Sequence, residues 1–151
     1  MIVSTATLGQ LAGRVTMVSG GFDPLHPGHI EYFEAASQLG LPVLCNVSTD
    51  ADVERKHAPF LTQEERSRLI DAIRFIDFTH VASGTTAEVL RLLRPRIFAK
   101  GTDWRERLPE EEIRVCAELG ISIEYLDTVR SSSTGLLERF LDQQAHHMTR
   151  Y

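Results

Sequence analysis

The stretch RVTMVSGGFDPLHPGHIEYFEAASQLG, residues 14–40, carries the signals that decide the fold. Residues 14–19 are mostly apolar and predict a buried strand, which the double glycine at 20–21 ends. Residues 27–39 begin with proline and place apolar side chains on one face at spacings of three, which predicts a helix that stops at Gly40. A buried strand that leads directly into a helix is typical of an α/β protein with a parallel sheet.

The alternation of strand and helix continues along the rest of the chain. Further strands are expected at residues 43–47, 78–82, 96–99 and 121–126, and further helices at residues 62–75, 87–93, 109–120 and after 131–134. The strands are continuous apolar runs, which favours a parallel sheet covered by helices on both faces. We therefore predict an α/β fold, a Rossmann-like five-stranded parallel sheet in a single domain over residues 1–151.

Other segments carry weaker patterns. Residues 50–60 are polar and charged and predict a loop after the second strand. Residues 1–13 are expected to form a short helix or a loose arm, and residues 143–151 a frayed tail. In the last helix, four apolar residues are expected to face inward: Leu136, Leu137, Phe140 and Leu141.

Composition and charge exclude several classes of protein. The chain has 151 residues, of which 42% are apolar and 25% charged, as expected for one domain with one core. A net charge of -5 argues against a long basic face for nucleic acid, and no apolar run approaches the roughly 18 residues of a membrane span. We see no signal-peptide pattern and expect Cys45 and Cys116 to be buried free thiols, so we predict a cytoplasmic protein.

The segment between the first strand and the first helix, residues 20–29, predicts an anion-binding site. Gly20 and Gly21 let the backbone approach a ligand closely. The N-terminus of the following helix offers free N–H groups and positive potential to a phosphate. His26 and His29 stand three residues apart on one turn and can direct donors into the same small volume. In an α/β protein, ligands are expected at this place, the carboxyl end of a strand.

This segment resembles the His-x-Gly-His signature of the cytidylyltransferase-like nucleotidyltransferases. The family includes glycerol-3-phosphate cytidylyltransferase, the adenylyltransferase of ADP-heptose synthesis and, more distantly, pantetheine-phosphate and nicotinamide-mononucleotide adenylyltransferases. The resemblance extends from about residue 15 to residue 141. It implies that a phosphorylated acceptor attacks the α-phosphorus of CTP or ATP and that pyrophosphate leaves. The nucleotide-binding residues that it implies here are Gly21, Phe22, Asp23, His26, Gly28 and His29, with His26 and His29 also catalytic.

A second match lies in the loop after the second strand and in the helix that follows it. Lys56 and the run Glu64-Glu65-Arg66 look like the loop lysine and helix start with which the sugar- and polyol-phosphate branch grips the triphosphate and the acceptor phosphate. The resemblance thus implies catalytic roles for Lys56 and Arg66, and arginine suits a bidentate phosphate contact. His57 is a candidate loop contact to phosphate, and His80 is expected to be structural.

Two further matches follow the fourth strand and precede the last helix. The run Lys100-Gly101-Thr102-Asp103-Trp104 resembles a Gly-x-Asp-aromatic stretch of the family and implies nucleotide contacts from Lys100, Gly101 and Asp103. Its first half looks like the heptose adenylyltransferases and its second half like the glycerol-phosphate enzyme, so ATP and CTP both stay open. The run Ser131-Ser132-Ser133-Thr134 resembles the family's hydroxyl motif, which implies that Ser132, Ser133 and Thr134 bind phosphates. The Thr-Glu-Gly-Ile stretch of glycerol-phosphate enzymes is absent, which argues against that acceptor.

The resemblance also implies cofactors and partners. A magnesium ion is expected to bridge phosphate oxygens, with Asp23 and Asp103 as candidate ligands. The preferred acceptor is a sugar phosphate or a polyol phosphate, and the preferred assembly is a homodimer without nucleic-acid or membrane partners. Two alternatives stay open: a coenzyme-forming adenylyltransferase of the flavin or pantetheine class, and a nucleotide-binding sensor without turnover on the same fold.

Overall fold

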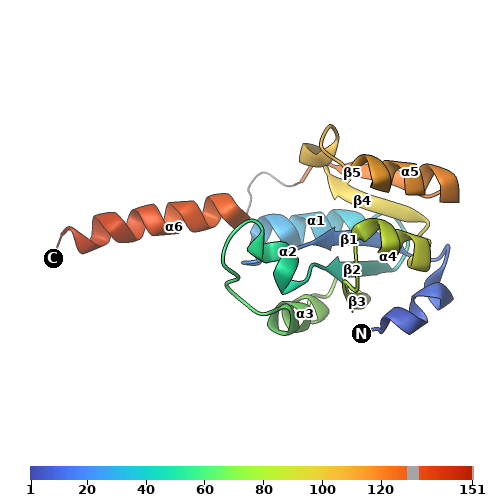
Figure 1. Cartoon of the computed structure of the whole chain (residues 1–151), viewed down its shortest axis with the longest axis horizontal. Helices are drawn as coiled ribbons and strands as arrows, with labels where there is room; N and C mark the ends of the chain where they lie inside the picture. The colour runs from blue at the N-terminus through green and yellow to red at the C-terminus, as the bar shows by residue number, and fades with distance from the viewer. Residues whose placement is uncertain (129–132, 151) are drawn as a thin grey trace.

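A five-stranded, all-parallel sheet in the order β3-β2-β1-β4-β5 forms the centre of the protein (Figure 1). The computed structural model describes residues 1–128 and 133–150. The strands are β1 Thr16–Gly20, β2 Val43–Val47, β3 Phe78–Val81, β4 Ile97–Gly101 and β5 Ser122–Leu126. The helices are η1 Thr5–Leu11, α1 Pro27–Ser37, α2 Asp50–Glu54, α3 Gln63–Asp71, α4 Thr86–Leu93, η2 Thr102–Trp104, α5 Glu110–Leu119 and α6 Ser133–Met148. The predicted Rossmann-like α/β fold is confirmed.

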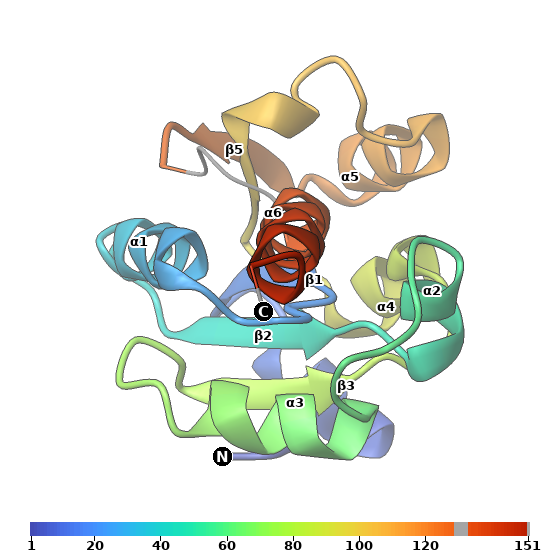
Figure 2. The same cartoon turned by 90° about the vertical axis from the view of Figure 1, so that its left-hand side faces the viewer.

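Successive strand residues pack into two apolar clusters, one on each face of the sheet. Met17 and Leu44 contribute to the cluster that η1, α4 and α5 cover. Their chain neighbours Val18 and Cys45 contribute to the cluster that α1 and α3 cover. Figure 2 shows α1 on one side of the sheet and α4 and α5 on the other. Both cysteines are buried free thiols, as predicted.

The N-terminal segment packs onto the body of the protein. Ile2 forms a parallel bridge to Thr79 of β3. Leu8, in η1, is completely buried in the cluster beneath α4. This segment, for which the sequence allowed a short helix or a loose arm, is therefore a 3-10 helix tied to the edge strand.

Residues 50–54 form a helix where we expected only loop. Thr49 is the N-cap of α2 and accepts a hydrogen bond from the backbone N–H of Asp52 at 3.2 Å. Asp50 and Asp52 add negative charge to the first turn, which favours the positive end of the helix dipole. The next helix, α3, opens with a capping box between Thr62 and Glu65 but ends at Asp71, before the predicted residue 75.

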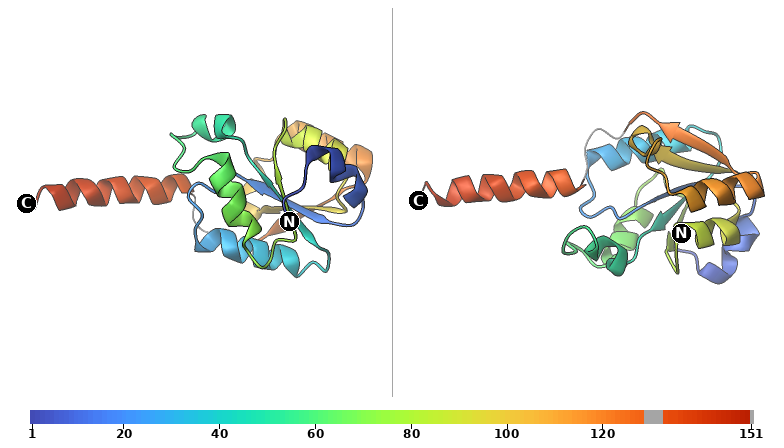
Figure 3. Two further views of the ribbon diagram at one scale, coloured as in Figure 1. Left: turned by 90° about the horizontal axis from the view of Figure 1, so that it is seen from below. Right: turned by 45° about the horizontal axis from the view of Figure 1, so that its top comes forward.

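Helix α6 projects away from the sheet as a long rod (Figure 3). Phe140 is 53% exposed and Leu141 is 66% exposed, so the expectation that they face inward is wrong for the single chain. The stretch expected to be a frayed tail is helical as far as Met148. No helix within the described residues is long and apolar enough to span a membrane.

Candidate functional site

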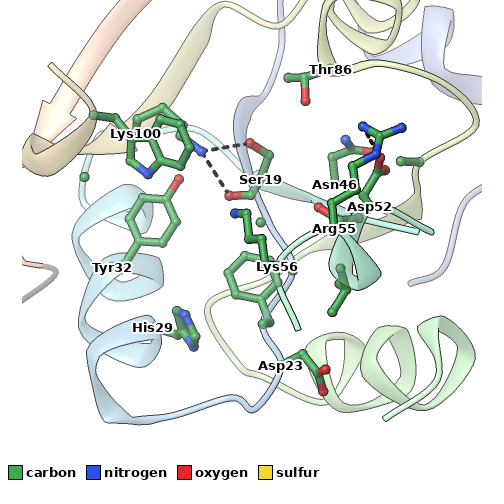
Figure 4. A pocket seen from close by; sticks show the side chains of 18 of the residues that line it. Ser19, Asp23, His29, Tyr32, Asn46, Asp52, Arg55, Lys56, Thr86 and Lys100 are labelled. Atoms are coloured by element: carbon green, nitrogen blue, oxygen red, sulfur yellow. Dashed lines mark hydrogen bonds and ion pairs between the residues drawn. The ribbon is translucent and has the colours of Figure 1, made fainter. Parts of the chain in front are cut away.

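A pocket of about 800 Å³ opens at the carboxyl ends of β1, β2 and β4 (Figure 4). Its walls come from the turn after β1, from α1 and α2, from the turn before α4 and from η2. The strand order turns back at β1, so the pocket lies where an open α/β sheet is expected to bind ligands. The predicted site residues that line the pocket are Gly21, Phe22, Asp23, His29, Lys56, Lys100, Gly101 and Asp103.

The remaining predicted residues are placed differently. His26 and Gly28 lie at the N-terminus of α1, next to His29. Arg66 is buried behind the turn after β1 rather than in the pocket wall. Ser132 lies outside the described residues. Of Ser133 and Thr134, the structure describes the helical backbone at the start of α6 but not the side chains.

Hydrogen bonds fix the protonated nitrogen of both histidines. His26 is the N-cap of α1, and its Nδ1 accepts a hydrogen bond from the backbone N–H of Gly28 at 3.1 Å. The Nδ1 of His29 accepts one from the backbone N–H of His26 at 3.3 Å. The two rings stack with their centroids 3.7 Å apart. Because Nδ1 is the acceptor in each ring, the proton of each neutral imidazole is on Nε2.

Both histidines are uncharged donors at neutral pH. Burial lowers the pKa of His26. Burial, with a smaller contribution from the neighbouring His26, lowers the pKa of His29 to about 3. Within the described residues, no hydrogen-bond partner faces the Nε2 of either ring, and that of His26 is buried. Two N–H donors are thus preorganised at a helix N-terminus, where a phosphate is favoured.

The turn before the histidines needs glycine for close packing. A Cβ on Gly20 would lie 2.9 Å from Cζ of Phe22, closer than side-chain carbons approach. Phe22 has a left-handed backbone with φ 52° and packs edge-on against His29, with ring centroids 5.0 Å apart. Gly20 therefore makes room for the aromatic ring that holds His29 in place.

Lys100 is a buried cation that also lines the pocket. Its Nζ lies 3.4 Å from both the carbonyl oxygen and the Oγ of Ser19, and 4.3 Å from the ring centre of Trp104. Burial lowers the pKa of Lys100 to about 8. Nearby Lys56 lowers it further, whereas the carboxylates of Glu112 and Asp103 oppose the shift.

Two more cations lie around Trp104. The Nζ of Lys56 is 5.9 Å and the guanidinium of Arg107 is 5.1 Å from the ring centre. With Lys100, three positive side chains surround one indole at the pocket, an arrangement that attracts an anion and supports it with an aromatic surface. Sequence reasoning did not single out Arg107, which lies outside the matched run.

Asp23 and Arg66 hold the backbone around the pocket. The carboxylate of Asp23 accepts hydrogen bonds from the backbone N–H groups of Phe60 and Leu61 at 2.7 and 2.9 Å. The guanidinium of Arg66 donates to the carbonyl oxygens of Gly21 and Ser48, at 2.9 and 2.8 Å, and to Oδ1 of Asp50 at 2.8 Å. With a fully buried side chain, Arg66 ties the ends of β1 and β2 together.

A second group of polar side chains lines the far side of the pocket. Figure 4 shows Asn46, Asp52, Arg55 and Thr86 together, away from His29 and Lys100. Sequence reasoning assigned no role to any of them. Asn46 did carry a signal, since it is a polar residue near the carboxyl end of the otherwise apolar strand β2. Ser19 in β1 carries the same signal.

The described side chains do not form a complete metal site by themselves. No group of three or more His, Cys, Asp or Glu side chains in residues 1–128 and 133–150 is arranged to hold a metal ion. Both oxygens of Asp23 accept backbone hydrogen bonds, whereas Asp103 lies exposed at the pocket. Of the two predicted ligands, Asp103 is the more accessible, because Asp23 is only 2% exposed.

Comparison with known proteins places the chain in a sequence family. The family model described as cytidylyltransferase-like matches residues 17–138. The chain is 36% identical over 97 residues to the bifunctional protein HldE of Magnetococcus marinus. The aligned region covers 62% of this chain and 20% of that protein. It is 32% identical over 136 residues to the bifunctional protein HldE of Syntrophotalea carbinolica, covering 85% of this chain and 27% of that protein. The chain thus spans 20–27% of the length of these curated relatives.

Solved structures show the same fold. The lipopolysaccharide core biosynthesis protein from Thermoplasma volcanium matches with a TM-score of 0.63 and 25% identity, over 74% of this chain and 93% of that chain. A protein of unknown function from Archaeoglobus fulgidus matches with a TM-score of 0.57 and 21% identity, over 79% of this chain and 93% of that one. The second match supports the fold alone.

Proposed function

Because the chain belongs to the cytidylyltransferase-like family, we propose that it is a nucleotidyltransferase that moves the nucleoside monophosphate of CTP or ATP onto a sugar phosphate or polyol phosphate and releases pyrophosphate. The observation that carries the proposal is the pair of neutral histidines at the N-terminus of α1, each with its Nε2–H unpaired within the described residues. The Nε2–H of His26 is buried without a partner, which destabilises the empty fold, and that of His29 faces the pocket, so the pair is arranged for a ligand that accepts from both.

The chemistry needs no covalent intermediate with the protein. An oxygen of the acceptor phosphate attacks the α-phosphorus, the bond from the α-phosphorus to the bridging oxygen breaks, and pyrophosphate leaves in line with the attack. His26 and His29 donate to the α-phosphate and bridging oxygens as negative charge develops. Preorganised donors of this kind are worth roughly 3 kcal/mol each in the transition state. Lys56 and Lys100, which also line the pocket, supply positive charge to the phosphates.

Magnesium fits this scheme as a companion of the substrate. When bound, it would neutralise phosphate charge, and it usually binds through substrate phosphates and one or two carboxylates. We assign the protein contact to Asp103, because Asp103 is exposed at the pocket whereas Asp23 is only 2% exposed and holds two backbone N–H groups.

ATP and a sugar phosphate are the substrates that we favour. The run Lys100-Gly101 resembles the heptose adenylyltransferases, and two of the most similar curated proteins are named HldE. The solved relative from Thermoplasma volcanium is named a lipopolysaccharide core biosynthesis protein, a name that is consistent with a saccharide acceptor.

A homodimer is the assembly that we propose. Helix α6 leaves Phe140, Leu141 and Met148 uncovered in the single chain. A contiguous apolar stripe of this kind on a projecting helix is typical of a surface that a second protein covers.

Pyrophosphate release tests the proposed reaction directly. Purified protein with magnesium is given ATP or CTP together with sugar phosphates, glycerol-3-phosphate, or flavin and pantetheine precursors. We expect release that requires ATP and a sugar phosphate. Release with a coenzyme precursor alone would instead identify a coenzyme-forming enzyme. Nucleotide binding without release across the panel would identify a sensor.

A further inference from the structure

Asn46 is a nearly buried amide at the end of β2 that lines the pocket on the side away from the histidines (Figure 4). It is only 3% exposed, and its Oδ1 lies 2.8 Å from Nδ1 of His80 in the neighbouring strand β3. On the other side of the imidazole, Nε2 lies 2.9 Å from Oγ1 of Thr5 in η1. A chain of hydrogen bonds therefore runs from the N-terminal segment through His80 to the pocket.

The chemistry of these groups fixes the direction of each bond. An amide oxygen can only accept, so Nδ1 of His80 carries the proton and donates to Asn46. Burial lowers the pKa of His80, which keeps the ring neutral and leaves Nε2 as an acceptor. The hydroxyl of Thr5 therefore donates to Nε2. In this orientation Oδ1 of Asn46 accepts from His80, and Nδ2 is the end of the amide that remains for another partner.

The opposite end of the amide is left for a ligand. Among the described residues, no hydrogen-bond partner faces the Nδ2 of Asn46. Asn46 lines the pocket, so this donor is available to an acceptor atom of a ligand. The hydroxyl of Thr86 also lines the pocket.

Asp52 and Arg55 complete the polar wall. One oxygen of Asp52 accepts a hydrogen bond from Oγ1 of Thr49 at 2.9 Å, and the other lies 3.4 Å from the guanidinium of Arg55. The wall therefore presents an amide donor, a hydroxyl, a carboxylate acceptor and a mobile cation. Hydroxyl groups on a ligand both donate and accept, so a hydroxylated ligand can satisfy all of these groups, whereas an apolar arm or aromatic ring would leave Asn46 unpaired.

We propose that this side of the pocket is the acceptor subsite and that Nδ2 of Asn46 donates to a hydroxyl oxygen of a polyhydroxylated acceptor, a sugar phosphate rather than a coenzyme precursor. The inference rests on the proposed transferase function for the identity of the acceptor. Asn46 determines specificity, and His80 and Thr5 are positioning residues that act through it. The N-terminal segment thereby contributes to substrate selection without touching the substrate.

Equilibrium binding of small phosphates tests the subsite without any turnover. The probes are glucose 1-phosphate, mannose 1-phosphate and propyl phosphate, which carries the phosphate without the hydroxyls. By calorimetry, we expect at least one sugar phosphate to bind about tenfold more tightly than propyl phosphate. In Asn46→Ala this preference is lost, while the affinities for propyl phosphate and ATP stay unchanged.

A variant of Thr5 tests the positioning role. Thr5→Val keeps the side-chain shape and removes the donor to His80. We expect it to weaken sugar phosphate binding by about threefold, and to have no further effect when combined with Asn46→Ala. Thr7→Val is the matched control, because the Thr7 hydroxyl in the same helix bonds only to the carbonyl oxygen of Ser4.

Three outcomes overturn parts of the inference. If the wild type binds propyl phosphate as tightly as both sugar phosphates, the side with Asn46 is not a hydroxyl-binding subsite. If Asn46→Ala keeps the full preference, Asn46 does not recognise the sugar. A penalty of Thr5→Val that persists in the Asn46→Ala background shows that Thr5 does not act through Asn46. Binding preference without pyrophosphate release would contradict the transferase function and leave the subsite intact.

Discussion

The two histidines differ in their access to substrate, and this predicts unequal effects of their removal. His29 lines the pocket, whereas His26 lies behind it as the helix cap. His29→Ala is expected to lower kcat for pyrophosphate release by about 100-fold or more, with little change in the free energy of unfolding. His26→Ala removes a donor and the N-cap, so it should also destabilise the protein by about 1 kcal/mol. Steady-state kinetics and urea unfolding of both variants separate these effects.

His146→Ala is the matched control for these variants, because His146 is exposed on the projecting helix α6. It should leave both kcat and stability unchanged. Equal kcat values for His29→Ala and the wild type would contradict the role of His29.

Lys100 predicts how nucleotide affinity depends on pH. Burial lowers its pKa from 10.5 to about 8, and bound phosphates would raise it again. Below pH 8 the side chain is charged in the free protein and binding is at full strength. As the pH rises above 8, binding must take up a proton, so ATP affinity should fall by up to tenfold per pH unit. Calorimetric titrations between pH 7 and about 9.5 measure this fall.

The loss of ATP affinity above pH 8 is distinguished from alkaline unfolding by the sign of the change in the free energy of unfolding. Between pH 8 and 10.5 the unfolded chain keeps a proton on Lys100 that the folded chain has lost, so this residue makes the free energy of unfolding rise with pH. Affinity and the contribution of Lys100 to stability therefore change in opposite directions. Lys100→Arg, whose charge persists at high pH, should flatten the affinity profile. An unchanged profile in that variant would assign the titration to another group.

Among the individual residues of the site, only some were predicted from residue type and position along the strands. His29 and Lys100 were found because they follow strands in a recognisable motif, and the structure places both at one pocket. Asn46 was missed because its role depends on His80, which lies 34 residues away, and on Thr5, 75 residues before His80. Such a role arises from tertiary pairing and leaves only a weak trace in the local sequence.

Helix α3 contributes a structural element to the site through Arg66. Its guanidinium joins the ends of β1 and β2, and its partners include two backbone carbonyls. Arg66→Ala is therefore expected to lower the free energy of unfolding by about 3 kcal/mol, because it leaves buried acceptors without a donor. Arg68→Ala, an exposed arginine on the same helix, should change it by less than about 0.5 kcal/mol.

Denaturant unfolding and ATP binding distinguish the two interpretations of Arg66. If Arg66 were a direct phosphate contact, Arg66→Lys would weaken ATP binding and leave stability nearly unchanged. We expect the opposite for Arg66→Lys: the free energy of unfolding falls by more than the free energy of ATP binding.

Among the elements, the strands were predictable and the polar connections were not. The predicted bounds of β2 agree with the structure at both ends, because its apolar run lies between Pro42 and a polar turn. Helix α2 was missed, although the capping residue Thr49 and the acidic first turn were present, because its short length gives no apolar periodicity. Helix α6, in contrast, was predicted from its apolar periodicity, but the expectation that its apolar face points inward was wrong. An apolar stripe on a helix does not specify which surface covers it.

At the scale of the whole molecule, the projecting helix predicts self-association. Leu137, Phe140, Leu141 and Met148 fall on one face of α6 at helical spacing, and the last three are 53%, 66% and 75% exposed. A second copy presents the same stripe, so two antiparallel or parallel helices can cover each other in a symmetric contact. Sedimentation equilibrium of the wild type should therefore give the mass of a dimer.

Leu141→Glu tests whether this stripe is the contact. The substitution places a charge in the apolar seam, so we expect the mass to fall to that of a monomer while the circular dichroism of the fold is retained. His146→Glu adds a charge on the opposite face of the helix and should leave the dimer intact. A dimer that survives Leu141→Glu would move the interface to another surface, and a monomeric wild type would exclude the homodimer.

Pairing along α6 would also affect the start of this helix, where Ser133 and Thr134 lie. The paired helix would fix the direction in which the backbone N–H groups of these two residues point. If the predicted phosphate contacts at the start of α6 are correct, Leu141→Glu should therefore also weaken ATP binding.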